Sequence, residues 1–168
     1  MRLLGLDPGL RVTGWGVIDA VDNRLRWVAD GVVRSDETLS LGERLAQLHR
    51  GVIEVIARFA PEEAAVEETF VNQNPASTLK LGQARGAVLV AAALQGLFVA
   101  EYSPAKVKQS VVGTGRAAKE QVAMMIGRLL PGCAAETADA ADALAVAVCH
   151  AHHRGPLGRL QAMMEAKA

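Results

Sequence analysis

The chain has 168 residues, about half of them hydrophobic, which suits one globular domain with a sizeable core. Its formal net charge is zero and it has only two cysteines, which excludes a strongly basic polypeptide and a disulfide-stabilised secreted scaffold. No signal peptide is visible, and the longest apolar run, at residues 86–100, is too short to span a bilayer, so we expect a cytoplasmic protein without membrane contact.

Three strands are predicted at the start of the chain. Residues 2–6 form a nearly continuous apolar run, typical of a buried central strand, which ends at the turn Asp7-Pro8-Gly9. Residues 12–19 and 25–34 have strand character and are joined by the hairpin-like pair Asp22-Asn23. We therefore expect three antiparallel strands.

Helices and two further strands follow. Apolar residues at helical spacing, N-cap residues before proline, and glycine or proline stops mark the elements. The predicted helices cover residues 41–59, 74–95, 104–113, 118–130 and 137–153, and the predicted strands cover 64–67 and 98–102. This order predicts an α/β fold with a mixed sheet. We expect one domain over residues 1–155 and a loosely ordered tail over 156–168.

The charges are unevenly distributed despite the zero total. Residues 1–71 carry eight basic and twelve acidic side chains, whereas residues 72–128 carry seven basic and two acidic ones. The middle of the chain could therefore form a surface that faces phosphates. An unevenly charged, solvated surface explains the same pattern equally well.

Carboxylates stand at informative positions of the predicted fold. Asp7 ends the first strand, Glu67 ends the fourth, and Asp139 and Asp142 share one face of the last helix. A lone aspartate often only forms a turn or interacts with a helix dipole. Together, however, these acids can meet outside the carboxyl ends of the parallel strands if the first and fourth strands are neighbours.

Such a cluster predicts a metal centre. Converging carboxylates repel one another unless cations compensate their charge, and an all-oxygen set suits Mg²⁺ or Mn²⁺. Two ions roughly 4 Å apart can stabilise both the attacking and the leaving oxygen in phosphoryl transfer. We therefore expect two ions in the active site.

Several blocks of sequence, in order and over nearly the whole chain, identify a family. They are Gly5-Leu-Asp-Pro-Gly9, Thr13-Gly-Trp-Gly-Val17, Ala65-Val-Glu67, Leu79-Lys-Leu-Gly-Gln-Ala-Arg-Gly86, Val107-Lys-Gln-Ser-Val-Val-Gly113 and Ala138-Asp-Ala-Ala-Asp-Ala-Leu144. With these blocks the chain resembles the RuvC-type Holliday-junction resolvases.

The resemblance implies a ribonuclease H-like fold, with a mixed five-stranded sheet and helices on both faces. It implies a homodimer that hydrolyses phosphodiester bonds of four-way junction DNA with Mg²⁺ or Mn²⁺, in recombination and DNA repair. The two nicks would be paired and symmetric and leave 5′-phosphate and 3′-hydroxyl ends. The resemblance also implies RuvA and RuvB, the branch-migration proteins, as partners.

Carried over by position, the catalytic and metal-binding acids are Asp7, Glu67, Asp139 and Asp142. Glu67 is preferred to Glu68 because it directly follows the small apolar run. Some relatives have histidine where this chain has Asp142, so the site here is all carboxylate.

Basic and aromatic residues are expected to contact DNA. Lys119 and Lys108 match family lysines near the active centre, where Lys119 would assist catalysis. Lys80 and Arg85 would face backbone phosphates, unless their helix surface is simply solvated. Phe70 would stack on an unpaired base, unless it only anchors its loop.

Two further expectations concern the helices. A homodimer supplies two sites for two cuts, and the helix at 75–95 is apolar on more than one side, so we expect one side to pack on a partner, unless it is buried within one subunit. His150, His152 and His153 are interpreted as a helix end that favours the dipole and lies near phosphate, not as metal ligands.

Three rival hypotheses stay open. Residues 7–14 also resemble the phosphate loop of actin-like and sugar-kinase ATPases, although the chain is too short for their two lobes. A ribonuclease H-like nuclease for RNA or another branched DNA would keep the fold and change the substrate. The third alternative is a module that binds junctions without cutting them, which would not need the four acidic residues.

Overall fold

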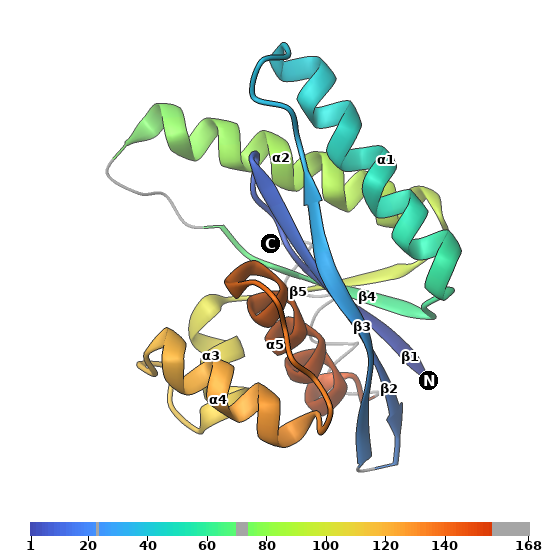
Figure 1. Cartoon of the computed structure of the whole chain (residues 1–168), viewed down its shortest axis with the longest axis vertical. Coiled ribbons are helices and arrows are strands. Elements are labelled where there is room, and N and C mark those ends of the chain that lie inside the picture. The colour runs from blue at the N-terminus through green and yellow to red at the C-terminus, as the bar shows by residue number, and fades with distance from the viewer. Residues whose placement is uncertain (23, 70–73, 156–168) are drawn as a thin grey trace.

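A computed structural model of the chain describes residues 1–22, 24–69 and 74–155 (Figure 1). Within them one sheet has the strand order β3-β2-β1-β4-β5. The strands are β1 (Arg2–Asp7), β2 (Val12–Val21), β3 (Arg24–Arg34), β4 (Glu63–Glu67) and β5 (Phe98–Tyr102). β1 is antiparallel to β2 and parallel to β4. β3 is antiparallel to β2, and β5 is parallel to β4. The predicted mixed five-stranded sheet is confirmed.

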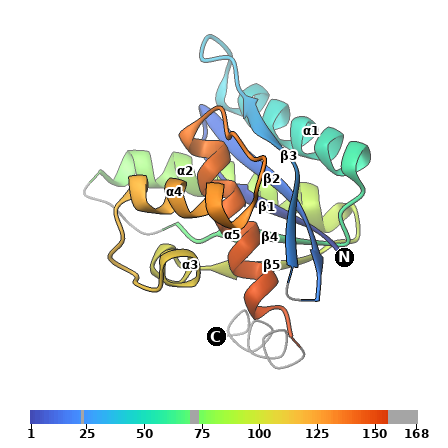
Figure 2. The ribbon, with the colours of Figure 1, turned by 60° about the horizontal axis from the view of Figure 1, so that its bottom comes forward.

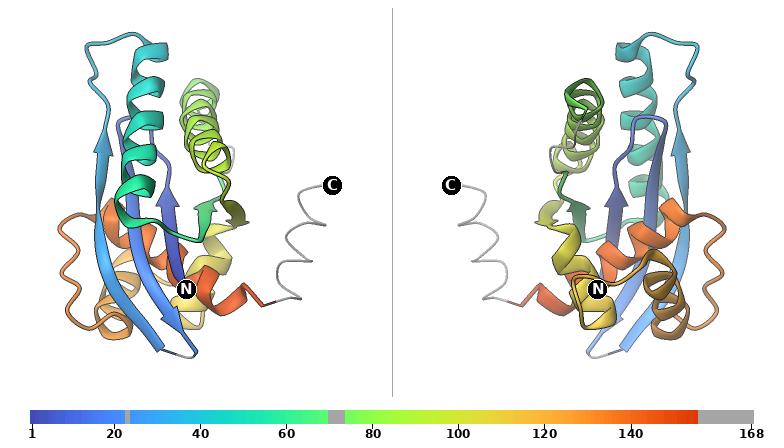
Figure 3. Two further views of the ribbon diagram at one scale, coloured as in Figure 1. Left: turned by 90° about the vertical axis from the view of Figure 1, so that its right-hand side faces the viewer. Right: turned by 90° about the vertical axis from the view of Figure 1, so that its left-hand side faces the viewer.

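Helices cover both faces of this sheet, as expected (Figures 1 and 3). They are α1 (Leu41–Phe59), α2 (Pro75–Leu94), α3 (Pro104–Val112), α4 (Lys119–Leu129) and α5 (Ala138–His153). One apolar core joins the sheet to α1 and α2, and another joins it to α3, α4 and α5. Among the described helices, none combines the length and apolar character that crossing a bilayer requires.

Local sequence signals start the helices where they were predicted. The side chains of Asn74, Ser103 and Thr137 accept hydrogen bonds from backbone N–H groups in the first turns of α2, α3 and α5. These caps satisfy donors that no carbonyl within the helix can reach. The chain therefore enters α5 at a defined residue, which fixes the positions of the side chains in its first turns.

α5 lies directly on the sheet (Figure 2). A Cβ atom built on Gly5 of β1 would lie 2.0 Å from the carbonyl oxygen of Ala143, and one on Gly14 of β2 would lie 2.0 Å from that of Asp139. Only glycine permits so close an approach of helix to strand. Residues 143–150 of α5 are all buried in consequence, so the helix has little freedom to shift.

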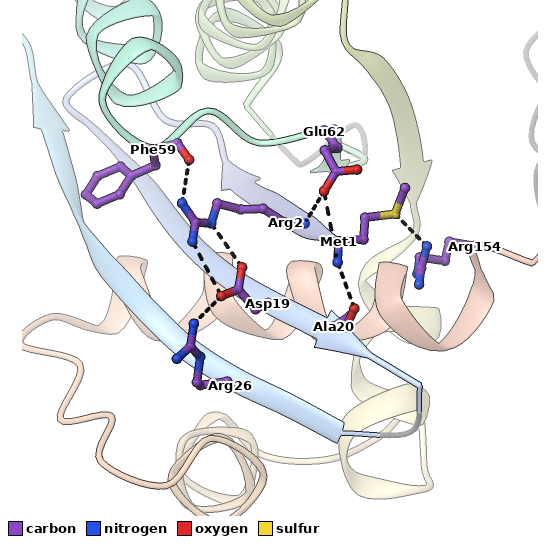
Figure 4. Close-up of polar contacts among 8 residues, drawn as sticks. All are labelled: Met1, Arg2, Asp19, Ala20, Arg26, Phe59, Glu62 and Arg154. Carbon is purple, nitrogen blue, oxygen red and sulfur yellow. Dashed lines mark hydrogen bonds and ion pairs between the residues drawn. The ribbon is translucent and has the colours of Figure 1, made fainter.

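The amino-terminal end of β1 is tied by charged groups (Figure 4). The Arg2 guanidinium donates to the Asp19 carboxylate at 3.0 Å and to the Phe59 carbonyl oxygen at 3.0 Å, joining β1 to β2 and to the end of α1. Arg26 of β3 donates to the same carboxylate at 2.6 Å. These bonds to Arg2 and Arg26 lower the pKa of Asp19. They fix the strand at the end opposite to Asp7.

Candidate metal centre

Two of the predicted acids end neighbouring parallel strands. Leu6 of β1 is in register with Val66 of β4, so Asp7 and Glu67 follow at the same edge of the sheet. Because side chains alternate along a strand, Asp7 lies on the same face as Gly5, which α5 contacts. Glu67 shares a face with Ala65, which belongs to the α5 core. Both carboxylates therefore face α5.

The other two acids come from the start of α5. Asp7 is in register with Gly14 on β2, and the backbone of Asp139 packs against that glycine. Asp142 lies three residues further along α5, so it projects from the same side of the helix. The close contact at Gly14 thus brings the first turns of α5 over the ends of β1 and β4, as the sequence predicted.

The acids influence one another electrostatically. Burial, followed by the charges of Glu67, Asp142 and Asp139, raises the pKa of Asp7 from 3.8 to about 7, while Lys119 opposes them. Burial and Asp142 also raise the pKa of Glu67, against Lys119 and Lys108. Like charges in a partly buried space stabilise the protonated forms unless cations are supplied. The carboxylates therefore favour the binding of a cation.

A basic side chain already touches the cluster. The Lys119 Nζ, at the start of α4, donates a hydrogen bond of 3.1 Å to Oδ2 of Asp142. This bond raises the pKa of Lys119. The Lys119 side chain is 74% exposed, so it can also reach a molecule bound over the acids. Lys108 of α3 lies near enough to Glu67 to lower its pKa.

The donor chemistry of the cluster suits a hard divalent cation, since four carboxylates offer only oxygen ligands. Among the described residues, no group of three or more histidine, cysteine, aspartate and glutamate side chains is already arranged to hold a metal ion. The coupled charges of the four carboxylates nevertheless favour the binding of a cation.

The remaining expected DNA contacts differ in their surroundings. Lys80 is exposed on α2. Arg85, on the same helix, is half-buried: its Nε donates to the Glu67 carbonyl oxygen at 3.4 Å and its guanidinium forms an ion pair with Glu101 of β5. The ordinary exposed surface considered for Arg85 is thus wrong. Phe70 lies outside the described residues.

His150 lies in the last turn of α5, as expected, but its side chain is buried, so the expectation that it lies near phosphate is wrong. Its Nε2 lies 2.9 Å from Oε2 of Glu63 and its Nδ1 lies 2.9 Å from the Tyr102 hydroxyl, all in the core. Burial lowers the pKa of His150 to about 4. A neutral ring fits this site, because Nε2–H can donate to Glu63 while Nδ1 accepts from Tyr102. Sequence reasoning singled out neither partner, since both are distant in the chain.

Of the other two histidines, His152 is exposed and His153 is half-buried, with its Nδ1 2.9 Å from the carbonyl oxygen of Cys149. Both lie in the last turn of α5, as expected.

Comparison with known proteins places this geometry in context. The family model described as "Crossover junction endodeoxyribonuclease RuvC" matches residues 3–150. The protein of that name from Paramagnetospirillum magneticum is 73% identical over 160 residues, which cover 95% of this chain and 96% of the relative.

Solved structures of RuvC proteins are similar to this chain over nearly its whole length. A RuvC structure from Thermus thermophilus has a TM-score of 0.83 at 38% identity and covers 96% of this chain and 98% of that one. The T. thermophilus RuvC in complex with a Holliday junction substrate has a TM-score of 0.81 at 38% identity, with 92% and 94% covered.

Proposed function

Because this chain belongs to the RuvC family of crossover junction endodeoxyribonucleases, we propose that its gathered carboxylates form the metal site with which it cuts Holliday junctions. The chain is a Holliday-junction resolvase, a metal-dependent DNA endonuclease of recombination and repair. The proposed ligands are Asp7, Glu67, Asp139 and Asp142. The observation that carries the proposal is the placement of Asp7 and Glu67 at the ends of neighbouring parallel strands, where the first turn of α5 packs on Gly14.

The ion is proposed to be Mg²⁺ or Mn²⁺, with two ions in each active site. Bound there, such a pair supplies an activated water and stabilises the charge on the departing 3′ oxygen. The protein's own part is to hold the oxygen ligands at fixed points. Asp7 and Glu67 stand at the ends of buried strands, and Asp139 and Asp142 stand on a helix locked against glycines. Hydrolysis then leaves 5′-phosphate and 3′-hydroxyl ends.

Two lysines are proposed to act on the DNA phosphate. Lys119 contacts Asp142 and is exposed, so its ammonium can turn from the carboxylate to the scissile phosphate and offset charge in the transition state. Lys108, which is near Glu67, would bind a neighbouring phosphate. Lys80, exposed on α2, would contact the backbone further away. Phe70, which lies outside the described residues, is proposed to stack on a junction base.

A homodimer is proposed, because paired symmetric nicks need two active sites related by a two-fold axis. α2 supports this: Leu79, Val90 and Leu94 are 65%, 51% and 69% exposed, which leaves apolar side chains in solvent along one helix. Such side chains gain from burial against a second copy. Sedimentation should give a dimer, and Leu94→Glu should shift it toward monomer and reduce paired cutting.

The nuclease is proposed to occupy a single domain of residues 1–155, acting in the cytoplasm with RuvA and RuvB. The described elements up to α5 contain both cores and all four acids. A variant ending at residue 155 should therefore keep junction cleavage. The two partner proteins are proposed from the family alone, and a pull-down with purified RuvA and RuvB tests them.

Cleavage of a synthetic four-way junction tests the proposed activity. Wild-type protein should nick opposing strands with Mg²⁺ or Mn²⁺ and not in EDTA, and should spare linear duplex and an RNA–DNA hybrid. Asp7→Asn should bind the junction and fail to cut it. Full cleavage by Asp7→Asn would contradict the metal site, and equal cleavage of the hybrid would contradict the substrate.

A further inference from the structure

Arg85 lies where α2 passes the carboxyl ends of β4 and β5. Its Nε donates a long hydrogen bond of 3.4 Å to the backbone carbonyl oxygen of Glu67, the last residue of β4. Its guanidinium forms an ion pair with the carboxylate of Glu101 on β5. Glu101 is in register with Val66, the residue before Glu67. One side chain therefore joins a helix to the ends of two strands.

These surroundings do not suit a contact with DNA phosphate. The Arg85 side chain is only 20% exposed and its charge is matched by a carboxylate. Burial lowers the pKa of Arg85, while the charge of nearby Glu68 raises it, but an arginine stays charged at any physiological pH. Turning the guanidinium toward DNA would break both its ion pair with Glu101 and its hydrogen bond to the Glu67 carbonyl oxygen.

The end of β4 needs such support. Glu67 carries a carboxylate that other acids repel, and a bound ion would pull on it. The backbone N–H of Glu68 donates to the carbonyl oxygen of Tyr102 at 2.9 Å. In addition, the Arg85 Nε donates its longer hydrogen bond of 3.4 Å to the Glu67 carbonyl oxygen. The two bonds together fix the backbone from which the Glu67 carboxylate projects.

We infer that Arg85, braced by Glu101, is a positioning residue for the Glu67 carboxylate and not a contact to DNA. The inference rests on the proposed role of Glu67 as a metal ligand. If so, replacing Arg85 should lower the affinity for metal and the cleavage rate, and should have little effect on the binding of DNA. It also links α2, the proposed dimer helix, directly to the active site.

Three variants distinguish a positioning role of Arg85 from a direct contact with DNA. Arg85→Met removes both polar contacts at similar length, Glu101→Gln removes only the charge of the brace, and Lys80→Ala removes an exposed cation from the same helix as a matched control. Calorimetry measures Mn²⁺ affinity without DNA, fluorescence anisotropy measures junction affinity in EDTA, and thermal melting reports folding. Cleavage is followed separately at saturating junction.

Arg85→Met should weaken Mn²⁺ binding and slow cleavage, each by about tenfold, the lower end of the effect of losing an outer-shell partner. Junction affinity in EDTA should stay within about twofold, a difference small beside one phosphate contact. Glu101→Gln should cause a smaller loss of the same kind. The double variant should be no worse than Arg85→Met, because both changes break one unit. Lys80→Ala should weaken junction binding and leave Mn²⁺ affinity unchanged.

Several results would overturn the inference. A loss of junction affinity in Arg85→Met as large as that in Lys80→Ala, with Mn²⁺ affinity unchanged, is the behaviour of a phosphate contact. A lower melting temperature with unchanged Mn²⁺ affinity and cleavage would make Arg85 only a packing residue. If Arg85→Met fails to fold, Glu101→Gln decides, and unchanged Mn²⁺ affinity in that variant refutes the brace.

Glu67→Gln keeps this test distinct from that of the proposed function. If Glu67→Gln binds Mn²⁺ as tightly as the wild type, the metal role of Glu67 fails and the positioning role fails with it. If Glu67→Gln loses Mn²⁺ affinity while Arg85→Met keeps it, the metal role stands and only the inference about Arg85 is refuted.

Discussion

Replacing Asp7 with asparagine should stabilise the metal-free protein. Burial, followed by the charges of Glu67, Asp142 and Asp139, raises the pKa of Asp7 from 3.8 to about 7. Ionising this carboxyl group in the folded protein therefore costs about 4 kcal/mol relative to the unfolded chain. Asn has nearly the same shape and carries no charge, so the variant avoids that cost.

The gain should depend on pH in a defined direction. Below the unfolded pKa of 3.8, Asp7 is protonated in both states and costs nothing. As pH rises toward 7, only the unfolded chain releases its proton, so the wild type loses stability relative to the variant. The expected advantage of Asp7→Asn is about 2 kcal/mol at pH 5 and about 4 kcal/mol at pH 8, where it levels off.

Urea unfolding in EDTA, followed by circular dichroism at pH 5 and pH 8, measures this advantage. Asp36→Asn is a matched control, because hydrogen bonds from the Thr38 side chain and backbone lower the pKa of exposed Asp36, so that variant should gain nothing. Adding Mn²⁺ should stabilise the wild type more than Asp7→Asn. A variant no more stable than the wild type at pH 8 would refute the electrostatic reasoning.

Four further changes have clear expected outcomes. Lys119→Ala should slow cleavage about 100-fold and weaken junction binding by less than about threefold, measured by single-turnover kinetics and anisotropy, because Lys119, which contacts Asp142, is proposed to offset charge on the reacting phosphate. Gly14→Ala should cost more than about 2 kcal/mol in urea unfolding and impair cleavage, because its Cβ would lie 2.0 Å from a backbone oxygen of α5. Gly82→Ala, where nothing lies within 4 Å of the new Cβ, should stabilise by up to about 1 kcal/mol. The pKa of His150 is lowered to about 4, so the wild type should lose stability relative to His150→Gln as pH falls from 7 to 5.

Three of these expectations have a contradicting result of their own. Equal loss of binding and cleavage in Lys119→Ala would make that lysine a simple phosphate contact. Normal stability of Gly14→Ala would mean that α5 can move away from the sheet at no cost. A constant difference between wild type and His150→Gln over that pH range would mean that the buried ring takes up a proton as easily as it does in the unfolded chain.

Local patterns explain why most of the fold and the acidic site could be predicted. The apolar strands, the caps at Asn74, Ser103 and Thr137, and the glycine and proline stops each act within a few residues. Asp7 and Glu67 were expected to meet once the first and fourth strands were taken as neighbours, which their register confirms.

Long-range partners explain what sequence reasoning missed. His150 has the sequence surroundings of a polar helix end, and only folding brings Glu63 and Tyr102 to its ring. Arg85 stands in a basic part of the chain, but its partner Glu101 comes from the next strand. Sequence spacing alone therefore leaves the role of a charged side chain ambiguous when its partner is distant in the chain. The charge of a residue does not reveal which group will neutralise it.

Anomalous scattering from a crystal soaked in Mn²⁺ tests the central claim most directly. The account predicts density for manganese between the carboxylates of Asp7, Glu67, Asp139 and Asp142, lost in Asp7→Asn. Density at another place on the chain, or none at a concentration that supports cleavage, would contradict a metal site built from these four acids.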